Sequence, residues 1–376
     1  MHIVFLVSHV PDPRIYKRIS VAKLQYNVSV IYWKRSFTNH KIFFEDKDIS
    51  RYEVISNTYG SYYINRVKRI KILLKYTIRA LSILKKINPN IIYAANLDML
   101  FVAVSYKIIF NKKAKIIYEV ADLDRIIYND SLFIIDKIIS LIMWNTEKLL
   151  CRKINKLIIT SPYFWTEYYS KFVLKEDTIF IPNVPKKDLF RNLTYKSNKI
   201  LTIGFIGGVR YKEQLKMLID AGKELRNIKI LIAGGGPDYQ EIVEYSENLD
   251  FVYIYGSYNY ESEIAKLYSM VDIVYSVYGT KYKNVKIALP NRLYEAIASI
   301  KPIIVAKNTK LAEFVLEKGI GFVVSDTKQN DLVNLLRDII NKNIDLNIYR
   351  DNIKKIRSNY FMEVYDKKLL DLYKNL

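Results

Sequence analysis

Two glycine-rich turns carry the strongest sign of ligand chemistry in this sequence. The first turn, 207–208, follows the apolar run 200–206, and the second, 234–236, follows the apolar run 228–233. A glycine turn at the start of a helix presents unpaired N–H groups and the positive end of the helix dipole, which suits a diphosphate. One such turn alone is commonly a plain connection, whereas two at the carboxyl ends of neighbouring strands line one crevice. The glycines expected to approach the ligand are Gly207, Gly208, Gly234 and Gly235.

Charged and polar side chains for the same ligand stand close to these turns in the sequence. Arg210 and Lys212 directly follow the first turn. A later helix start carries Asn291, Arg292 and Glu295, with the basic residue and the carboxylate three positions apart on one helix face. A carboxylate accepts hydrogen bonds from a pair of ribose hydroxyls, and an arginine binds phosphate. These residues predict a nucleotide site in the second half of the chain.

The elements that must position these residues alternate along the chain. Short β-rich apolar runs are each followed by helix-compatible residues, which is the pattern of parallel βαβ units. In the first half the expected strands are His2–Val7, Val28–Trp33, Ile91–Ala94, Ile116–Glu119 and Leu157–Thr160. In the second half they are Ile200–Ile206, Ile228–Ala233, Phe251–Ile254, Asp272–Val277, Pro302–Ala306 and Gly321–Val324. The sequence therefore predicts an α/β protein with two Rossmann-like, doubly wound domains.

A stretch of turn-forming residues separates the two patterns. Pro182 and Pro185 lie in the segment 181–188, which interrupts both the strand and the helix periodicity and places the boundary near 186–198. With 376 residues the chain is also longer than a single compact core of ~250–300 residues. We expect a first domain over 1–190, a second over 191–348 and a C-terminal helix over 349–376.

Composition excludes several classes of protein. Half of the residues are hydrophobic and 26% are charged, as in folded rather than disordered chains. One cysteine, Cys151, and three histidines leave no disulfide framework and too few ligands for a Cys/His zinc site. The chain begins like a strand rather than a secretion signal, and charged residues interrupt its most apolar stretch, 131–150. We therefore expect a soluble or peripheral protein in a reducing compartment.

Five motifs, in order along the chain, resemble those of the family 4-like retaining glycosyltransferases of GT-B fold. Residues 181–183 resemble the family's I-P-N segment, and the two glycine turns resemble the opening of its donor domain and its G-x-G-P loop. Residues 267–273 resemble its l-Y-x-x-a-D-i motif, and 290–296 resemble the P-N-K-l-x-E form of its nucleotide-binding motif. The resemblance covers nearly the whole chain. It implies two Rossmann-like domains facing across a cleft, with the C-terminal helix crossing back to the first domain.

The same resemblance implies a donor and a set of donor contacts. The donor would be a nucleoside diphosphate sugar of UDP or GDP type, with no metal and no other cofactor, and Glu295 would contact the ribose. The chain departs from the family in that Ile287 replaces a second glutamate, while Gly208 and Glu213 occupy the positions of the Arg and Lys that grip the diphosphate. The expected substitutes are Arg210, Lys212 and Arg292, with Arg210 assisting catalysis by stabilising the leaving diphosphate.

On the acceptor side, Ala121 stands where family members often carry a histidine. Any acid–base or sugar-orienting role then passes to Glu119, Asp122 or Asp124, at the carboxyl end of a strand and facing the cleft. The alternative is that these three are helix-capping and turn residues. The residues expected to contact the acceptor, by resemblance and analogy of position, are Arg14, Lys17, Asn96 and Asp98. His9 more often belongs to such a loop as a structural residue than as a base.

Most of the formal net charge of +21 lies in residues 1–190, which contain 31 Lys and Arg residues and 16 Asp and Glu residues. Residues 62–87 are helix-compatible and contain no acid. On a helical wheel one arc is cationic, and the stripe of Val67, Ile70, Leu74, Ile78 and Leu81 is expected to pack on the sheet. A solvated face and an anionic membrane surface both fit this arc, whereas no nucleic-acid-binding motif accompanies it. The membrane-facing residues would be Lys68, Lys71, Lys75 and Arg79.

By this resemblance the chain transfers a sugar with retention to a growing saccharide, during assembly of a surface polysaccharide such as a capsule. The acceptor would be a free or a lipid-linked saccharide. It would work in the cytoplasm, on the inner face of the cell membrane. Two alternatives remain open: a nucleotide-sugar 2-epimerase, and a membrane-associated scaffold of the same fold that has lost its chemistry, as Ala121 and Ile287 suggest.

Overall fold

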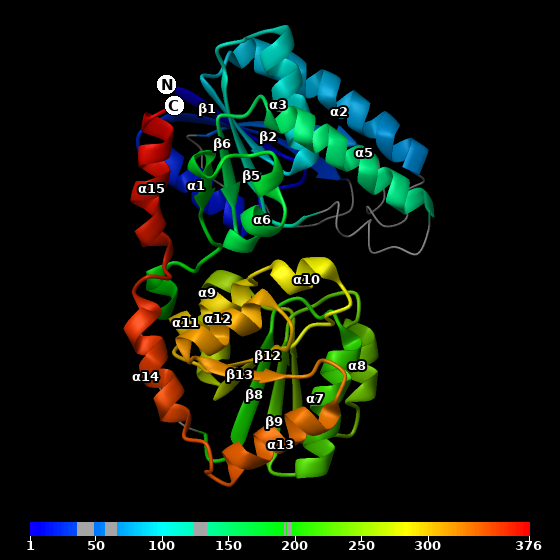
Figure 1. Ribbon diagram of the computed structural model, residues 1–376, viewed down its shortest axis with the longest axis vertical. Coiled ribbons are helices and arrows are strands. Elements are labelled where there is room, and N and C mark those ends of the chain that lie inside the picture. The colour runs from blue at the N-terminus through cyan, green and yellow to red at the C-terminus, as the bar shows by residue number, and fades with distance from the viewer. Residues whose placement is uncertain (36–48, 57–65, 124–133, 192, 194–197) are drawn as a thin grey trace. The chain divides into compact units, whose positions relative to one another are not determined.

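The computed structural model describes residues 1–35, 49–56, 66–123, 134–191, 193 and 198–376. The chain divides into two compact units (Figure 1). The first unit comprises Met1–Pro182 together with Tyr365–Leu376, and the second comprises Asn183–Val364. Asp124 and the side chain of Lys68, both singled out from the sequence, lie outside what is described.

The first unit is built on one parallel sheet of seven strands, in the order β3-β2-β1-β4-β5-β6-β7. Its strands are β1 (His2–Val7), β2 (Asn27–Arg35), β3 (Ser50–Ser56), β4 (Ile91–Ala95), β5 (Lys115–Val120), β6 (Lys156–Ile159) and β7 (Thr178–Phe180). Strands β1 and β4 are almost entirely buried, as expected where helices cover both faces of a parallel sheet. The carboxyl ends of all seven strands therefore lie along one edge.

The helices of this unit are α1 (Pro13–Lys23), α2 (Arg66–Ile87), α3 (Leu97–Ile109), α5 (Ile134–Cys151), α6 (Pro162–Glu167) and α15 (Met362–Lys374). Right-handed crossovers in this strand order place α2, α3 and α5 on one face of the sheet and α1 on the other (Figure 1). Asp12 caps α1, since its side chain accepts a hydrogen bond from the N–H of Ile15, and Pro13 begins the helix.

The second unit repeats the design with six parallel strands in the order β10-β9-β8-β11-β12-β13. The strands are β8 (Leu201–Ile206), β9 (Ile228–Ala233), β10 (Val252–Gly256), β11 (Ile273–Ser276), β12 (Ile303–Ala306) and β13 (Gly321–Val324). The helices are α7 (Lys212–Leu225), α8 (Tyr239–Tyr245), α9 (Tyr260–Ser269), α10 (Lys283–Ile287), α11 (Asn291–Ala298), α12 (Lys310–Lys318), α13 (Gln329–Ile340) and α14 (Leu346–Arg357). Strand order reverses between β8 and β11, which is where open sheets of this kind bind ligands.

The structure confirms the two doubly wound domains and the strands expected from the sequence. It adds β3 and β7, two edge strands that the apolar pattern does not reveal, because β3 is polar and β7 has three residues. The units divide after Pro182, earlier than the boundary expected near 186–198. The C-terminal segment forms two helices, α14 and α15, rather than one from residue 349, and it is residues 365–376 that join the first unit.

Helix α2 packs on a different face from the one expected. Leu74 and Ile78, assigned to the packing stripe, are 53% and 68% exposed. The buried face consists of Tyr76, Thr77, Ala80 and Leu84. Tyr76 stacks on Trp33 with ring centroids 5.2 Å apart, and its hydroxyl donates to the sulfur of Met99. A large aromatic side chain with a polar partner thus fixes which face is buried, and Leu74 and Ile78 stay outside.

Across the described residues, none of the helices combines the length and apolar character needed to cross a membrane.

Candidate active site

In the second unit the two glycine turns lie in direct backbone contact. Gly207 and Gly234 have φ angles of +125° and +127°, a conformation that L side chains rarely adopt. A Cβ atom added to Gly234 would lie 2.1 Å from the carbonyl oxygen of Gly207, and one added to Gly236 would lie 2.3 Å from that of Val209. The N–H of Val209 donates to the carbonyl of Gly235. Gly234 and Gly236 are therefore needed for the turns to meet, while the expected approach of the glycines to a ligand stays a prediction.

Arg292 supports the first turn from α11. Its Nε donates to the carbonyl oxygen of Ile206, and its Nη2 lies 3.3 Å from that of Gly208. The guanidinium carbon lies 3.5 Å from the ring centroid of Phe205, and the residue is buried. The sequence suggested that Arg292 faces phosphate, whereas here it faces the carbonyl oxygens of the turn. A direct contact with the ligand stays a prediction.

The two cations after the first turn differ in their surroundings. The Nζ of Lys212 lies 2.8 Å from a carboxylate oxygen of Glu241, and its backbone N–H donates to Asp238. The hydrogen bond from Lys212 lowers the pKa of Glu241. Arg210 is exposed and forms no hydrogen bond or ion pair with any residue that the structure describes. Arg210 is thus the cation beside this turn that is available to an anionic ligand.

Glu295, the carboxylate expected to contact the ribose, lies among three tyrosine side chains. It is 5% exposed, and the hydroxyl of Tyr268 donates to its Oε2 at 2.9 Å. Tyr260 also hydrogen-bonds to Glu295, and burial and the charge of Glu295 together raise the pKa of this tyrosine. Burial and the same carboxylate raise the pKa of Tyr258, which precedes α9. The three tyrosines stay neutral, and Tyr260 and Tyr268 hydrogen-bond to the carboxylate.

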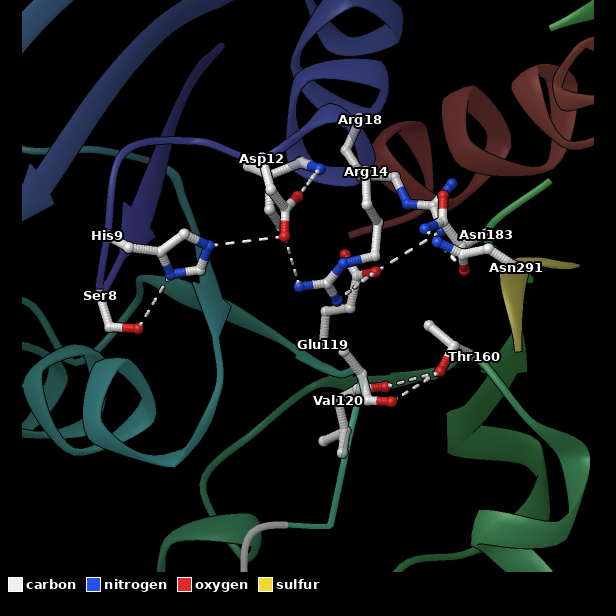
Figure 2. Close-up of polar contacts among 12 residues, drawn as sticks. Ser8, His9, Asp12, Arg14, Arg18, Glu119, Val120, Thr160, Asn183 and Asn291 are labelled. Carbon is white, nitrogen blue, oxygen red and sulfur yellow. Dashed lines mark hydrogen bonds and ion pairs between the residues drawn. The ribbon is translucent and has the colours of Figure 1, made fainter. Parts of the chain in front are cut away.

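Two of the short motifs meet beside this cluster. The Nδ2 of Asn183, from the I-P-N segment, donates to the Oδ1 of Asn291 at 3.0 Å (Figure 2). Asn291 begins α11, the helix that also carries Arg292 and Glu295. Residues far apart in the sequence are in this way held at one end of α11.

An aromatic group beside the first turn could not be found from the sequence. Tyr211 has a φ of +63°, uncommon for a residue with a side chain, and stands at the start of α7 without capping it. Its ring centroid lies 5.1 Å from that of Tyr278 and 6.1 Å from that of Tyr282. Tyr278 also accepts a hydrogen bond from Arg292 through its hydroxyl. Left-handed backbone at a tyrosine leaves no pattern in the sequence.

In the first unit, Glu119 is sealed inside a cationic cluster rather than facing open space. Its Oε1 lies 3.1 Å from Nη1 of Arg14 and 3.5 Å from Nη2 of Arg18 (Figure 2). The hydroxyl of Tyr93 donates to its Oε2. Glu119 is fully buried. Burial opposes the charge of Arg14, but the carboxylate of Glu119 outweighs it and raises the pKa of that arginine. The sequence prediction that Glu119 faces the cleft as an acid–base residue is wrong.

The arginine and lysine assigned to the acceptor are buried as well. Arg14 and Lys17 are 5% and 6% exposed, and their contact with an acceptor stays a prediction. Arg14 is drawn inward by Glu119 and by Asp12, whose Oδ2 lies 3.6 Å away. Burial opposes ionisation of Asp12, but His9, Arg14 and the N–H of Ile15 outweigh it and lower its pKa. His9, at 3.4 Å from Asp12, is part of this loop, as the structural alternative held.

The other acceptor-side residues lie at the carboxyl edge of the sheet. Asn96 has a φ of +73° and no side-chain cap, and its backbone N–H donates to the carbonyl oxygen of Glu119. Asp98 accepts from the N–H of Met99, within its own helix. Asp122, exposed after β5, lines a small cavity together with Asn96. The structure brings Asn96 and Asp122 together, while their contact with an acceptor stays a prediction.

A buried carboxylate at this cavity was not identified as a site residue from the sequence. Glu147, on α5, accepts hydrogen bonds from the hydroxyls of Tyr118, Tyr168 and Tyr169 at 2.7, 2.6 and 2.5 Å. Burial and the charge of Glu147 raise the pKa of Tyr118 and of Tyr169. Glutamate on a long apolar helix gives no sign of its three partners. Among the described side chains, no group of three or more His, Cys, Asp or Glu residues is arranged to hold a metal ion.

Comparisons with known proteins agree with this geometry. Residues 174–356 match the family model of glycosyl transferases group 1. A curated relative, the succinoglycan biosynthesis protein ExoL of Rhizobium meliloti, is 24% identical over 293 residues, covering 74% of this chain and 70% of the relative.

Solved structures share the fold over the full chain. A sucrose-phosphate synthase from Thermosynechococcus elongatus superposes with a TM-score of 0.77 at 15% identity, covering 100% of this chain and 99% of the other. HepE from Anabaena, solved in complex with UDP and glucose, superposes with a TM-score of 0.73 at 17% identity and covers 100% of both chains. The chain therefore has the GT-B fold, and residues 174–356 match the family model of glycosyl transferases group 1.

Proposed function

We propose that this protein transfers a sugar from a nucleoside diphosphate sugar to a saccharide acceptor during assembly of a bacterial surface polysaccharide such as a capsule. The succinoglycan protein that it resembles supports the pathway class, and the UDP-bound HepE structures support UDP as the first nucleotide to try, with GDP as the alternative. The donor is the substrate, and the reaction uses no further cofactor.

The observation that carries the proposal is the pair of glycine turns in backbone contact, with Arg210 beside them. The first turn leads into α7, whose N-terminal N–H groups and helix dipole favour a diphosphate. Gly208, where the atom nearest to an added Cβ is Nε of Arg210 at 3.6 Å, leaves room for the phosphates to approach the backbone, and Arg292 holds the turn in place. As the glycosidic bond breaks, negative charge grows on the diphosphate, and Arg210 and the helix start stabilise that charge without a metal.

The nucleoside would be held through Glu295 on α11. Its carboxylate is fixed by tyrosine hydroxyls, so it is positioned before a ligand arrives. Ribose hydroxyls would donate to this carboxylate, as the family resemblance implies. Gly235 and Asn291 would complete the donor contacts.

The proposed transfer proceeds with retention by attack on the same face of the donor sugar, as the family resemblance implies. The acceptor oxygen bonds to the anomeric carbon, the bond from that carbon to the diphosphate oxygen breaks, and the acceptor proton passes to the diphosphate. The buried ion pairs of Glu119 fit a route that needs no strong base from the protein. Asp122 and Asn96, at the carboxyl edge, would orient acceptor hydroxyls.

The acceptor in this proposal is lipid-linked, and the protein works on the cytoplasmic face of the cell membrane. Lys71, Lys75 and Arg79 on α2 are exposed, as the membrane prediction requires. Anionic headgroups attract such cations with about 1 kcal/mol for each suitably close Lys or Arg.

A thermal-shift series with UDP, GDP, CDP and ADP tests the donor site. A ligand present at ~100 times its Kd adds about 2.7 kcal/mol to the stability of the folded state. We expect stabilisation by UDP or GDP, followed by release of that nucleotide from its sugar conjugate when acceptor lipid extract is added. Absence of any shift across the series would contradict the proposal.

A catalytically silent scaffold is the second candidate, favoured by the sealed carboxylate Glu119 and by Ala121. It predicts nucleotide binding with no sugar transfer from any donor that binds. Turnover of a bound donor would exclude it. A nucleotide-sugar 2-epimerase would instead convert the donor without any acceptor.

A further inference from the structure

Helix α5 presents its apolar side chains to the outside and its acids to the inside. Asp136 and Glu147 are buried, although charged side chains normally occupy the exposed face of a surface helix. Six large aliphatic residues are instead 52% to 76% exposed. They are Ile134, Ile135, Ile138, Leu141, Ile142 and Leu149.

Two more helices on the same face of the sheet, α2 and α3, add to this surface. Leu74 and Ile78 are exposed on α2, and α3 exposes Phe101 as well as the apolar cluster 108–110 at its end. Helix α3 packs against both α2 and α5, and all three lie on the same face of the sheet. We call the exposed apolar residues of α2, α3 and α5 the apolar face.

Nothing comparable occurs on the other described helices. Helices α12, α14 and α15 each expose one large aliphatic residue: Leu316, Ile348 and Val364. Single exposed aliphatic side chains are normal on soluble proteins, whereas contiguous groups mark interaction sites or membrane contacts. The apolar face therefore needs a partner.

The charges around the apolar face are of one sign. Where side chains are described on α2, α3 and α5, every exposed charged residue is cationic, and the acids are buried or, like Asp98, half-buried. The exposed cations are Lys71, Lys75, Arg79, Lys85, Lys86, Lys137 and Lys148. Aliphatic side chains flanked by lysines match the two layers of an anionic bilayer surface, hydrocarbon and headgroup. A protein partner would be expected to require acids and hydrogen-bonding groups as well.

We propose that the apolar face docks on an anionic lipid bilayer, with the aliphatic side chains of α5 inserted below the headgroups and the lysines at headgroup level. This inference rests on the membrane-bound function proposed above, but moves the main anchor from the cations of α2 to the isoleucines of α5. The N-terminal half of α5 lies at the carboxyl edge of the sheet, because a helix that follows a parallel strand runs back along it. An acceptor carried on lipid would thus reach the edge that holds Asn96 and Asp122.

The proposal is tested by flotation with vesicles of phosphatidylethanolamine and phosphatidylglycerol. In the variant carrying Ile138→Ser, Leu141→Ser and Ile142→Ser, binding should fall at least about tenfold, at low and high salt alike, because the lost term is hydrophobic. The variant carrying Lys137→Gln and Lys148→Gln should lose binding only at low salt, where charges are least screened. The matched control carries Leu316→Ser and Ile348→Ser in the second unit and should bind as the parent does.

A single dye label gives a second readout that does not depend on loss of binding. The only cysteine, Cys151, is buried, so a cysteine introduced by Ile142→Cys can be labelled with an environment-sensitive dye. The dye should shift to shorter wavelength on vesicles, and one placed by Leu316→Cys should not. No shift at position 142, or vesicle binding unchanged in the triple serine variant, would overturn the proposal.

Two further measurements separate the other outcomes. Light scattering measures the oligomeric state of the parent and of the triple serine variant. If the parent is dimeric, the variant is monomeric and neither binds vesicles, the apolar face contacts a second copy of this chain and lipid docking is overturned. UDP and GDP thermal shifts of the triple variant should equal those of the parent. Lipid binding without nucleotide binding would contradict the proposed function alone, and nucleotide binding without lipid binding would contradict this inference alone.

Discussion

Arg14 and Glu119 form a buried ion pair in the first unit, with the arginine Nη1 3.1 Å from the glutamate Oε1. The pair joins the start of α1 to the carboxyl end of β5, two elements 105 residues apart in the sequence. Arg18 and Tyr93 complete the contacts of the carboxylate. A carboxylate so enclosed holds the loop before α1 in place and cannot reach an acceptor hydroxyl without breaking two ion pairs.

Glu119→Gln should destabilise the protein by ~3–5 kcal/mol, because it removes the buried negative charge that both Arg14 and Arg18 contact. Urea unfolding measures the loss. Glu167→Gln is the control, since Glu167 is exposed at the end of α6. Turnover per folded molecule should be similar in both variants. A stable Glu119→Gln protein that binds donor and fails to turn over would instead make Glu119 a catalytic residue.

Asp12 gives the fold a defined response to acid. Its pKa is lowered in the folded state, so its contribution to stability is complete above the unfolded pKa of about 3.9 and is lost as the pH falls below that value. Asp12→Asn keeps a capping side chain but removes the charge. The stability difference between parent and variant should be constant near neutral pH and shrink below about pH 4. A difference that grows on acidification would contradict the ion-pair assignment.

Gly234→Ala should disrupt the donor site, while Gly208→Ala should be tolerated. A Cβ at Gly234 would lie 2.1 Å from a backbone oxygen at a φ of +127°, so the two turns would have to separate. At Gly208 the nearest atom, Nε of Arg210, is 3.6 Å away. We expect a loss of more than ~2 kcal/mol for Gly234→Ala and less than ~0.5 kcal/mol for Gly208→Ala. Equal thermal stabilities of the two variants would contradict the contact between the turns.

The fold was largely predictable because the spacing of apolar residues along the chain indicates which residues are buried. Strands such as β4, buried at every position, leave an unbroken apolar run that no other arrangement explains as well. On α2 the same argument failed, because its aliphatic residues occupy more than one face of the helix. Stacking of Tyr76 on Trp33 decides between the faces, and a pairing of residues that distant is not contained in a local period.

The glycine turns were predictable and the burial of the charged residues in the first unit was not, for one physical reason. Glycines required by a turn are a local feature, since the backbone angle belongs to the residue itself. The burial of Arg14 depends on Glu119, and the three tyrosines around Glu147 converge from β5 and from the region after α6. Charged residues at strand ends look alike in sequence, whether they face a ligand or one another.

Glu295→Gln should weaken nucleotide binding by ~1.5–3 kcal/mol, the range for hydrogen bonds to a charged group. Isothermal titration with UDP and GDP measures the change. Tyr268→Phe is the companion variant, because it removes the hydroxyl that holds the carboxylate and leaves its charge. A smaller loss is expected there, since Tyr260 still binds Glu295. Unchanged affinity in a folded Glu295→Gln protein would remove Glu295 from the site.

Arg210→Ala should lower turnover more than it weakens the binding of free UDP or GDP. Arg210 is exposed beside the first glycine turn, and its guanidinium is not engaged by another described residue. Charge on the diphosphate oxygens grows as the glycosidic bond breaks, so a cation there stabilises the transition state more than the ground state.

Lys212→Ala is the matched control. Lys212 lies two residues after Arg210 and is also cationic, but its side chain is hydrogen-bonded to Glu241. It should change turnover little, since its charge is already partly neutralised. Steady-state kinetics with a donor that binds, together with titration of UDP and uridine, separates the two effects. If Arg210→Ala reduces affinity for uridine as much as for UDP, the variant has lost its local fold. If Lys212→Ala costs more turnover than Arg210→Ala, the ion pair with Glu241 must open in the donor complex, and Lys212 takes the catalytic role assigned to Arg210.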